Sequence, residues 1–592
     1  MKTRKSRIRF WSIIGSVVVV LAIVGGIGAW VASLVFSAKD SLEHAQGLVT
    51  QIKDKATAQD VDGAIKLVDQ LRDDTADAVA TTNEPIWLFF EGTPVLGSNL
   101  TAVRQLSSVL DNLVAETVDP IVAVAAGGLD SFKPVDGRID VEKIRAVTAA
   151  LTTADAGIVK AEASLDKIET KDTVSQVSAA ADKLTDMLAT TREPIAEIQK
   201  VLAVAPGLLG GDGPRTYIVL FPNNAESTSL GGNTAAWVIL NVNDGKVEIG
   251  AQPSSADFGR DDGPPIVLPE NLEDLYGVNY FNVVTNIELR PDFPTAGQIA
   301  QGFWERNTGQ VADGVISFDP VALSYLLWAT GPLQLPTGQV LSSDNAVQLL
   351  LSDVYSIYKS PAEQDAFFAG AAAAVFAAIT TSTPDIPTLF KSLNQAIDEN
   401  RLMMWSTRPE EQALLAGTKM EGVLAPDNVD NTEIGVFFIE NSASKMSYYL
   451  QTGVKMTNNA CVAPNAPSFN VSVDLHSAIT AEQYVALPAY VKSQFYKSPL
   501  KTRTLVYVYG PVGATYTDTV WNGNGLGSKV VKTGTDLGRP VVGVYVDLRP
   551  GESSNLSVNF TAAPGEFGLG TVRTTPMIQP TAVTVENPSC QG

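Results

Sequence analysis

The pattern of hydrophobic and polar positions changes three times along the chain. Residues 10–36 form an uncharged, mostly apolar run, and residues 41–202 carry apolar positions at three- and four-residue spacing. Short apolar runs mixed with helical stretches follow over residues 215–425, and short runs separated by turn residues fill residues 430–592. Spacing of three and four predicts amphipathic helices, whereas short or alternating runs predict strands. The sequence therefore predicts a multidomain α+β protein.

The run 10–36 follows five basic residues in a tip of nine. About 20 apolar residues span a bilayer as a helix, whereas the apolar part of a cleaved signal peptide is only about 7–15 residues long. Ala32 and Ser33 form a weak candidate cleavage site, but the length of the run favours an uncleaved anchor. Positive charges stay on the cytoplasmic side. We therefore expect a cytoplasmic tip over residues 1–9, a single transmembrane helix over residues 10–36, and an extracytoplasmic chain from residue 37.

Residues 37–204 are predicted to form an extracytoplasmic bundle of four to six helices that acts as a stalk or spacer. Its apolar stripes are Leu42, Ala45, Val49, Ile52 and Ala56, then Val103, Leu106, Leu110 and Leu113, then Ile158, Ala161, Leu165 and Ile168, and finally Val174, Val177, Ala181, Leu184 and Leu188. Breaks are expected at Glu84-Pro85 and Asp119-Pro120. The glycine- and proline-rich segment 205–214 predicts a domain boundary.

Residues 215–425 are predicted to form an α/β domain with inserted helices. Asp319 followed by Pro320 is typical of a helix start, with an N-cap acid and proline at the first helical position. Residues 343–417 are predicted to be helical. Asn243-Asp244-Gly245 predicts a hairpin turn. Strands are expected at residues 216–221, 235–242, 246–250 and 314–318.

Residues 430–592 are predicted to form a β-sandwich, because strand-like runs follow one another without intervening helices. The runs cover residues 433–439, 445–456, 468–476, 502–509, 541–548 and 555–560.

Charge and composition sharpen this arrangement. The 592-residue chain has a formal charge of -22, and its first acid is Asp40, so the part beyond the basic tip carries 37 basic and 64 acidic residues, or -27. Such a charge repels nucleic acid. Two histidines and two cysteines leave too few ligands for an ordinary zinc site. In an oxidising compartment Cys461 and Cys590 are expected to form a disulfide, with two unpaired thiols as the alternative.

A polar loop after the first strand of the α/β domain is a candidate ligand site. Asn223, Asn224 and Glu226 precede Gly231 and Gly232, and glycines permit close approach of the backbone to a ligand. The structural alternative is a network of Asx-turns that fixes the loop.

Two further charged loops are candidates. Arg290 and Asp292 lie between prolines on a stiff loop and could bind phosphate and metal, or pair with each other. Arg260 lies in a glycine- and proline-rich loop, where solvated charge is the simpler interpretation.

Four stretches resemble one family. They are Arg215-Thr-Tyr-Ile-Val-Leu-Phe-Pro-Asn-Asn-Ala-Glu-Ser-Thr-Ser-Leu-Gly-Gly232, Arg290-Pro-Asp-Phe-Pro294, Asp313-Gly-Val-Ile-Ser-Phe-Asp-Pro320 and Asn441-Ser-Ala-Ser-Lys-Met-Ser-Tyr-Tyr-Leu450. Their order and spacing resemble domain-of-unknown-function family 4012, found in envelope proteins of Gram-positive, especially high-GC, bacteria. The resemblance extends over residues 80–455. It implies an envelope protein without an established reaction. The modular outward architecture favours a non-enzymatic or weakly catalytic protein that binds envelope glycan or a protein partner through its α/β domain.

That family is distantly similar to the LytR-CpsA-Psr enzymes, so the resemblance implies a LytR-CpsA-Psr-like α/β domain. Those anchored enzymes transfer glycan polymers from polyprenyl pyrophosphate to the cell wall, with arginines on the phosphates and a metal such as Mg²⁺. Thr228 stands where family members often have arginine, and threonine cannot clamp a phosphate with two hydrogen bonds. A binding protein without cofactor is the first hypothesis. A phosphotransferase, with Mg²⁺, is the alternative.

Overall fold

The computed structural model describes residues 48, 51–52, 54–55, 60–93, 97–125, 133–259, 263–270, 272–277, 281–381, 385–494, 500–521 and 529–586. The predicted cytoplasmic tip and anchor lie outside these residues. The chain divides into two compact units. One comprises Met1–Gly213 with Asn243–Lys246, and the other Pro214–Val242 with Val247–Gly592.

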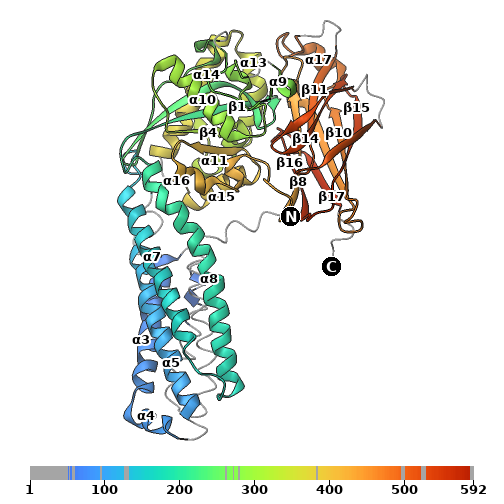
Figure 1. Ribbon diagram of the computed structural model, residues 1–592. Helices are drawn as coiled ribbons and strands as arrows, with labels where there is room; N and C mark the ends of the chain where they lie inside the picture. The colour runs from blue at the N-terminus through green and yellow to red at the C-terminus, as the bar shows by residue number, and fades with distance from the viewer. Residues whose placement is uncertain are drawn as a thin grey trace. The chain divides into compact units, whose positions relative to one another are not determined.

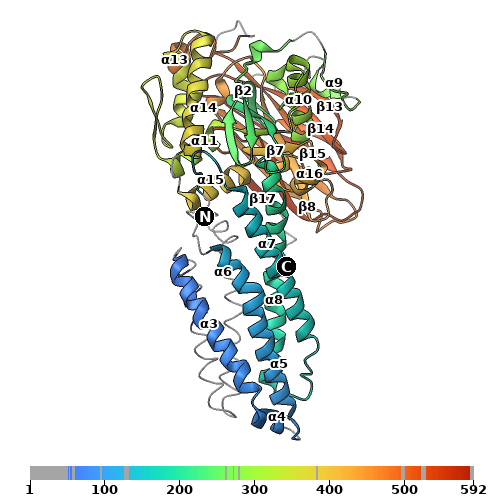
Figure 2. The same cartoon turned by 90° about the vertical axis from the view of Figure 1, so that its left-hand side faces the viewer.

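The first unit is a helical bundle, in which the long helices lie side by side (Figures 1 and 2). The predicted apolar stripes of residues 103–113, 158–168 and 174–188 are confirmed, because their members share one buried cluster, against which Val174 is partly buried. Of the stripe predicted over residues 42–56, only Ile52 is described, and it is buried. The helices are α3 (Val61–Thr82), α4 (Pro85–Glu91), α5 (Gly97–Leu113), the π-helix η2 (Val114–Val118), α6 (Asp119–Ala125), α7 (Val141–Leu165) and α8 (Ser175–Leu208).

Two prolines, Pro120 and Pro206, lie inside helices where the sequence predicts a break or a boundary. Pro85 opens α4 as expected, but the helix does not break at Asp119-Pro120. Pro120 is the second residue of α6, and the π-turn η2 before it already departs from the ordinary hydrogen-bond pattern, so the missing amide is tolerated. Helix α8 also continues through Pro206 to Leu208, so the boundary segment begins later than the glycines and prolines indicated.

The second unit contains a five-stranded mixed sheet in the order β3-β2-β1-β4-β7. Strand β1 pairs antiparallel with β2 and parallel with β4, and β4 pairs antiparallel with β7. The predicted strands and hairpin are confirmed, whereas β7 lies within the region predicted to be helical. Pairing with β4 supplies the backbone partners that make this short apolar run a strand. The strands are β1 (Arg215–Thr228), β2 (Gly231–Asn243), β3 (Lys246–Ile249), β4 (Gly314–Phe318) and β7 (Leu402–Ser406).

Helices cover this sheet and build its core. α10 (Phe293–Thr308) packs its apolar face against the strands in one buried cluster. α11 (Pro320–Thr330) begins as predicted, since the Asp319 carboxylate accepts a hydrogen bond from the Ala322 amide at 2.7 Å. The other helices of this part are α9 (Leu272–Tyr276), α12 (Ala346–Gln348), α13 (Val354–Ile357), α14 (Pro361–Thr381), α15 (Ile386–Asp398) and α16 (Pro409–Leu415).

Within the described residues, one helix is long and apolar enough to cross a membrane by length and composition, at Pro361–Thr380 in α14. One stripe of α14, with Phe367, Ala371 and Val375, is buried in a cluster shared with α11 and its neighbours. The helical conformation agrees with the prediction for residues 343–417.

Two further five-stranded sheets face each other across a common core, in the orders β12-β15-β10-β9-β17 and β13-β14-β11-β8-β16 (Figure 1). The predicted strand runs are confirmed except at residues 445–456, where a 3₁₀ turn, η8 (Met446–Tyr449), precedes the strand. A short helix, α17 (Ala481–Ala486), follows β10. The strands are β8 (Asn431–Glu440), β9 (Leu450–Asn458), β10 (Ser468–Ser477), β11 (Thr502–Tyr509), β12 (Thr515–Trp521), β13 (Lys529–Asp536), β14 (Arg539–Leu548), β15 (Ser553–Thr561), β16 (Leu569–Thr574) and β17 (Ala582–Glu586).

Candidate functional site at the carboxyl edge of the central sheet

The two parallel strands of the central sheet end at the same edge. Leu220 of β1 is paired with Ser317 of β4, and the chain beyond them carries Asn224 and Asp319. Ligands of α/β proteins commonly bind outside the carboxyl ends of the strands. The candidate loop of the sequence analysis therefore lies where a ligand site would be expected.

The loop is held by its own backbone and side chains. The Asn223 carbonyl side chain accepts from the Ala225 amide at 3.0 Å, which is the Asx-turn geometry of the structural alternative. A Cβ on Gly232 would lie 2.1 Å from the Asn223 backbone oxygen, so only glycine fits there. A Cβ on Gly231 would lie 3.4 Å from Glu288 Oε2. The glycines thus serve close packing of the chain on itself.

Glu226 is neutralised by a lysine from a distant part of the chain. Lys445 Nζ lies 2.8 Å from Glu226 Oε2 and 4.6 Å from the ring centre of Tyr355. Asn223 donates to the same tyrosine's hydroxyl at 2.5 Å. Burial alone would lower the pKa of Lys445, but the charges of Glu226 and Tyr355 raise it above its ordinary value. Lys445 belongs to the stretch 441–450, so the pair joins two of the motif-like stretches.

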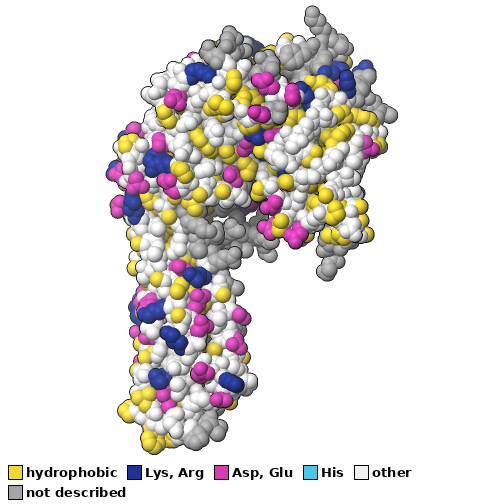
Figure 3. All heavy atoms as spheres, in the orientation of Figure 1, with side chains coloured by type: hydrophobic (Ala, Val, Ile, Leu, Met, Phe, Trp, Pro, Cys, Tyr) yellow, Lys and Arg dark blue, Asp and Glu magenta, His cyan; other side chains and the backbone are white. Residues whose placement is uncertain are grey.

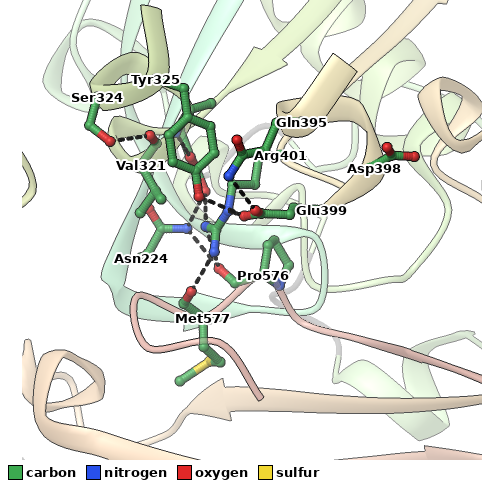
Figure 4. Close-up of polar contacts among 12 residues, drawn as sticks. Asn224, Val321, Ser324, Tyr325, Gln395, Asp398, Glu399, Arg401, Pro576 and Met577 are labelled. Atoms are coloured by element: carbon green, nitrogen blue, oxygen red, sulfur yellow. Dashed lines mark hydrogen bonds and ion pairs between the residues drawn. The ribbon is translucent and has the colours of Figure 1, made fainter. Parts of the chain in front are cut away.

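Asn224 takes part in a buried polar cluster, drawn in Figure 4. Arg401 donates to Asp319 Oδ2 at 2.8 Å and to the Met577 carbonyl at 2.7 Å. Asn224 Nδ2 donates to the same Asp319 oxygen at 2.8 Å and to the Pro576 carbonyl at 3.1 Å. Arg401 is 3% exposed, Asp319 1% and Asn224 0%. The carboxyl edge is therefore filled by the protein's own arginine and by its C-terminal segment.

The cluster reaches the surface through Glu399. This carboxylate accepts from Arg401 Nε and from the Tyr325 hydroxyl, each at 2.7 Å, and from Gln395 Nε2 at 3.0 Å. Burial alone would raise the pKa of Glu399, but these hydrogen bonds hold it below its ordinary value. Tyr325 also stacks on Trp328, with ring centres 5.0 Å apart and planes inclined by 23°, and Trp328 is 46% exposed.

A second carboxyl group lies buried beneath the loop. Glu288 is 0% exposed and accepts from the Ser317 hydroxyl at 2.7 Å. Burial raises its pKa to about 8, and the charge of Asp319 adds to the rise, against the hydrogen bonds from Ser317 and Gly232. Glu288 is therefore protonated at neutral pH.

Arg290 and Asp292 pair with each other, as one interpretation of the sequence held, but a third residue completes the group. Arg290 also donates to Asp536 of β13, with Nη2 2.8 Å from Oδ1 and Nε 3.0 Å from Oδ2. Arg290 is 6% exposed and Asp536 5%. The guanidinium of Arg290 is hydrogen-bonded to these two carboxylates, and Arg290 thereby joins the α/β part to the sandwich.

Arg215 is likewise hydrogen-bonded to a buried carboxylate of the chain. Its Nη2 lies 2.7 Å from both carboxylate oxygens of Glu411, and it is 2% exposed. Arg260 lies outside the described residues, so its role stays a prediction. Cys461 lies in the turn after β9 and Cys590 lies outside the described residues, so the disulfide also stays a prediction.

The sequence analysis did not identify Arg401, Glu399, Tyr325 or Glu288 as site residues. A signal existed for Arg401, because Asn400 and Arg401 directly precede a run of four apolar residues that lies in β7. The signal for Glu288 was weaker and consisted only of its position two residues before the candidate Arg290. Nothing in the sequence links either residue to Asp319. In the described part of the chain, no group of three or more histidine, cysteine, aspartate or glutamate side chains is placed to hold a metal ion.

A mixed helix-flanked sheet, a two-sheet sandwich and a helical bundle in one chain define a multidomain α+β protein. Residues 212–355 match the family model described as "Protein of unknown function (DUF4012)". The match supports the resemblance to this family and includes the first three of the four stretches that suggested it. No curated protein and no solved structure matches the chain.

Proposed function

We propose that the protein is a single-pass, membrane-anchored protein of the cell envelope, and that its extracytoplasmic α/β part binds envelope glycan on an aromatic shelf formed by Tyr325 and Trp328. The location rests on the apolar run 10–36 and its basic flank. The binding role rests on one observation: a half-exposed tryptophan stacked on a tyrosine beside an ionised carboxylate.

The shelf is chemically suited to a sugar ring. An aromatic face can cover the apolar C–H face of a pyranose, while nearby polar groups bind its hydroxyls. Tyr325 is fixed by its hydrogen bond to Glu399, and the backbone carbonyl of Tyr325 accepts from Ser392 of α15 at 2.7 Å. Tyr325 and Trp328 are therefore positioned before a ligand arrives, which reduces the entropic cost of binding.

The same geometry favours binding over phosphotransfer. Bidentate arginines recognise pyrophosphate only when their donors are available. Arg215, Arg290 and Arg401 are each buried and hydrogen-bonded to carboxylates of this chain. The strong negative charge also favours a neutral glycan over an anionic polymer.

A binding measurement with matched tryptophan variants tests the proposal. The full chain in detergent is titrated with neutral and anionic polysaccharide fractions of the envelope. Trp328→Ala should weaken binding of the neutral fraction by at least about tenfold, since losing one stacked aromatic contact removes more than about 1.4 kcal/mol. Trp328→Phe should retain most of it. Trp521→Ala, at another tryptophan that is 36% exposed, is the control and should bind normally.

Three results would count against the proposal. They are equal binding by Trp328→Ala and the unaltered chain, equal loss in Trp521→Ala, and micromolar binding of a polyprenyl pyrophosphate. The location is tested separately, by resistance of the chain to alkaline carbonate extraction and by protease access to its C-terminus in intact cells.

A further inference from the structure

One end of the helical bundle presents three consecutive large apolar side chains. Leu88, Phe89 and Phe90 of α4 are 45%, 71% and 43% exposed. We call them the apolar tip. Figure 3 shows hydrophobic side chains gathered at the α4 end of the bundle. Soluble surfaces seldom expose adjacent aromatic residues without a partner.

The apolar tip is held in place by contacts that do not involve its own three side chains. Trp87, in the same helix, is 4% exposed and donates its indole N–H to the Leu100 carbonyl at 3.1 Å. Glu91, the last residue of α4, accepts from Arg104 Nε at 2.6 Å and from Nη2 at 3.1 Å. The helix is therefore anchored to α5 at both positions, with Leu88, Phe89 and Phe90 directed away from the bundle core.

The described residues before α3, followed toward the N-terminus, run toward the same end of the bundle. Lys55 and Asp60 close a turn, with the Asp60 amide donating to the Lys55 carbonyl at 2.9 Å. Leu48 and Ile52, before the turn, share a buried cluster with Ala64 and Val68, after it. The described residues between 48 and 55 therefore run antiparallel to α3, so Leu48 lies nearer than Lys55 to the C-terminal end of α3, where α4 begins.

The reach of the chain agrees with this direction. Eleven residues lie between Leu48 and residue 36, where the expected anchor ends, and a chain of this length can span about 18 Å if helical and about 40 Å if extended. Val68 and Thr82 are fourteen positions apart in α3, which is about 21 Å along the helix. The chain is therefore long enough for the expected end of the anchor to reach the level of the apolar tip.

We propose that the apolar tip rests in the interfacial region of the lipid bilayer that holds the anchor. This inference depends on the proposed anchoring but not on glycan binding. Burial of leucine and phenylalanine side chains drives the contact. Because apolar burial drives the contact, it is insensitive to salt and requires no anionic lipid, to which the strongly acidic chain beyond residues 1–9 would not be attracted. The apolar tip and the expected anchor helix would together hold the bundle against the membrane at two points.

Photo-crosslinking from the full chain tests the contact. The photoreactive residue p-benzoylphenylalanine replaces Phe89, or Val135 as the control, in protein reconstituted into phosphatidylcholine vesicles. Val135 is also apolar and exposed, at 69%, but it precedes the start of α7, whose 25 residues run about 37 Å toward the α4 end. Lipid adducts are quantified by mass spectrometry at about 0.1 M and about 0.5 M salt.

We expect lipid adducts at position 89 at least about tenfold above those at position 135, unchanged by salt and by added anionic lipid. Adducts of position 89 with residues 1–47 or with a second copy, in place of lipid, would overturn the inference, as would equal lipid labelling at both positions. Carbonate extraction of the same vesicles distinguishes failure of the apolar-tip contact from failure of the membrane anchor. A retained chain without lipid adducts at position 89 refutes only the contact, whereas an extracted chain refutes the anchor and the contact together.

Discussion

The buried carboxyl group of Glu288 makes the stability of the α/β part depend on pH. Burial raises its pKa to about 8, from 4.5 for the free group. Between these values the folded chain keeps a proton that the unfolded chain has released. The free energy of unfolding therefore falls as the pH rises through this window.

The size of the effect follows from the two pKa values. Each unit of pKa difference corresponds to about 1.4 kcal/mol. Between about pH 5 and about pH 8 the buried carboxyl should lower the free energy of unfolding by about 3 kcal/mol. Glu288→Gln retains the shape and the hydrogen-bonding capacity of a protonated carboxyl without titrating. The variant should match the unaltered protein near pH 5 and exceed its stability by about 3 kcal/mol near pH 8.

Urea unfolding of the full chain in detergent measures this difference at several pH values. Tryptophan fluorescence is a suitable signal, because Trp237, Trp304 and Trp405 are buried in the core of the α/β part. Asp547→Asn is the control. Burial alone would raise the pKa of Asp547, but the hydrogen bonds and charges of Arg503 and Lys501 hold it below its ordinary value, so the group stays ionised. The difference in unfolding free energy between Asp547→Asn and the unaltered protein should therefore be constant over this pH range. A difference for Glu288→Gln that is equally flat would refute the reasoning.

Three other predictions concern structural contacts. Gly232→Ala should destabilise the protein by about 3 kcal/mol or more in urea unfolding, because its Cβ would meet the Asn223 backbone oxygen at 2.1 Å. Arg401→Met should cost about 3–5 kcal/mol, since it leaves Asp319 buried without its cation, and should lower the thermal midpoint accordingly. If the expected disulfide forms, Cys461→Ser should cost about 4 kcal/mol, and the unaltered chain should resist thiol labelling until reduced.

Each of these has a matched control. Gly565→Ala should be neutral, because the nearest atom to its added Cβ is 3.7 Å away. Adding Asp319→Asn to Arg401→Met should recover part of the loss, since it removes the unpaired charge. Cys590→Ser should match Cys461→Ser, and unequal effects would contradict the pairing.

Local patterns in the sequence were sufficient for much of the secondary structure. The stripe from Val103 to Leu113 and the cap at Asp319 depend on neighbours within a few residues, so their periodicity or chemistry is visible in the chain. Strand β7 was hidden, because a run of four apolar residues fits a helix or a strand until β4 supplies its hydrogen bonds. The polar, largely exposed strand β12 was missed for a related reason, since it lacks an apolar pattern.

The site required the tertiary structure. Asn223, Asn224, Glu226 and the two glycines were recognisable as a special loop, but whether they hold a ligand or their own chain depends on what packs against them. Arg401 arrives from about 180 residues downstream and the Pro576 carbonyl from about 350. No local pattern encodes such pairings.

The sequence by itself determined the distribution of charge, the apolar run at the N-terminus and the order of helical and strand-rich parts, because each is a property of neighbouring residues. Only the tertiary structure decided that the arginines are committed to buried carboxylates, that Glu288 is protonated, and that Trp328 and the apolar tip remain exposed. Burial and pairing depend on residues brought together across long separations. They set the pKa of a carboxyl and the availability of a guanidinium, and so they determine the chemistry open to the protein.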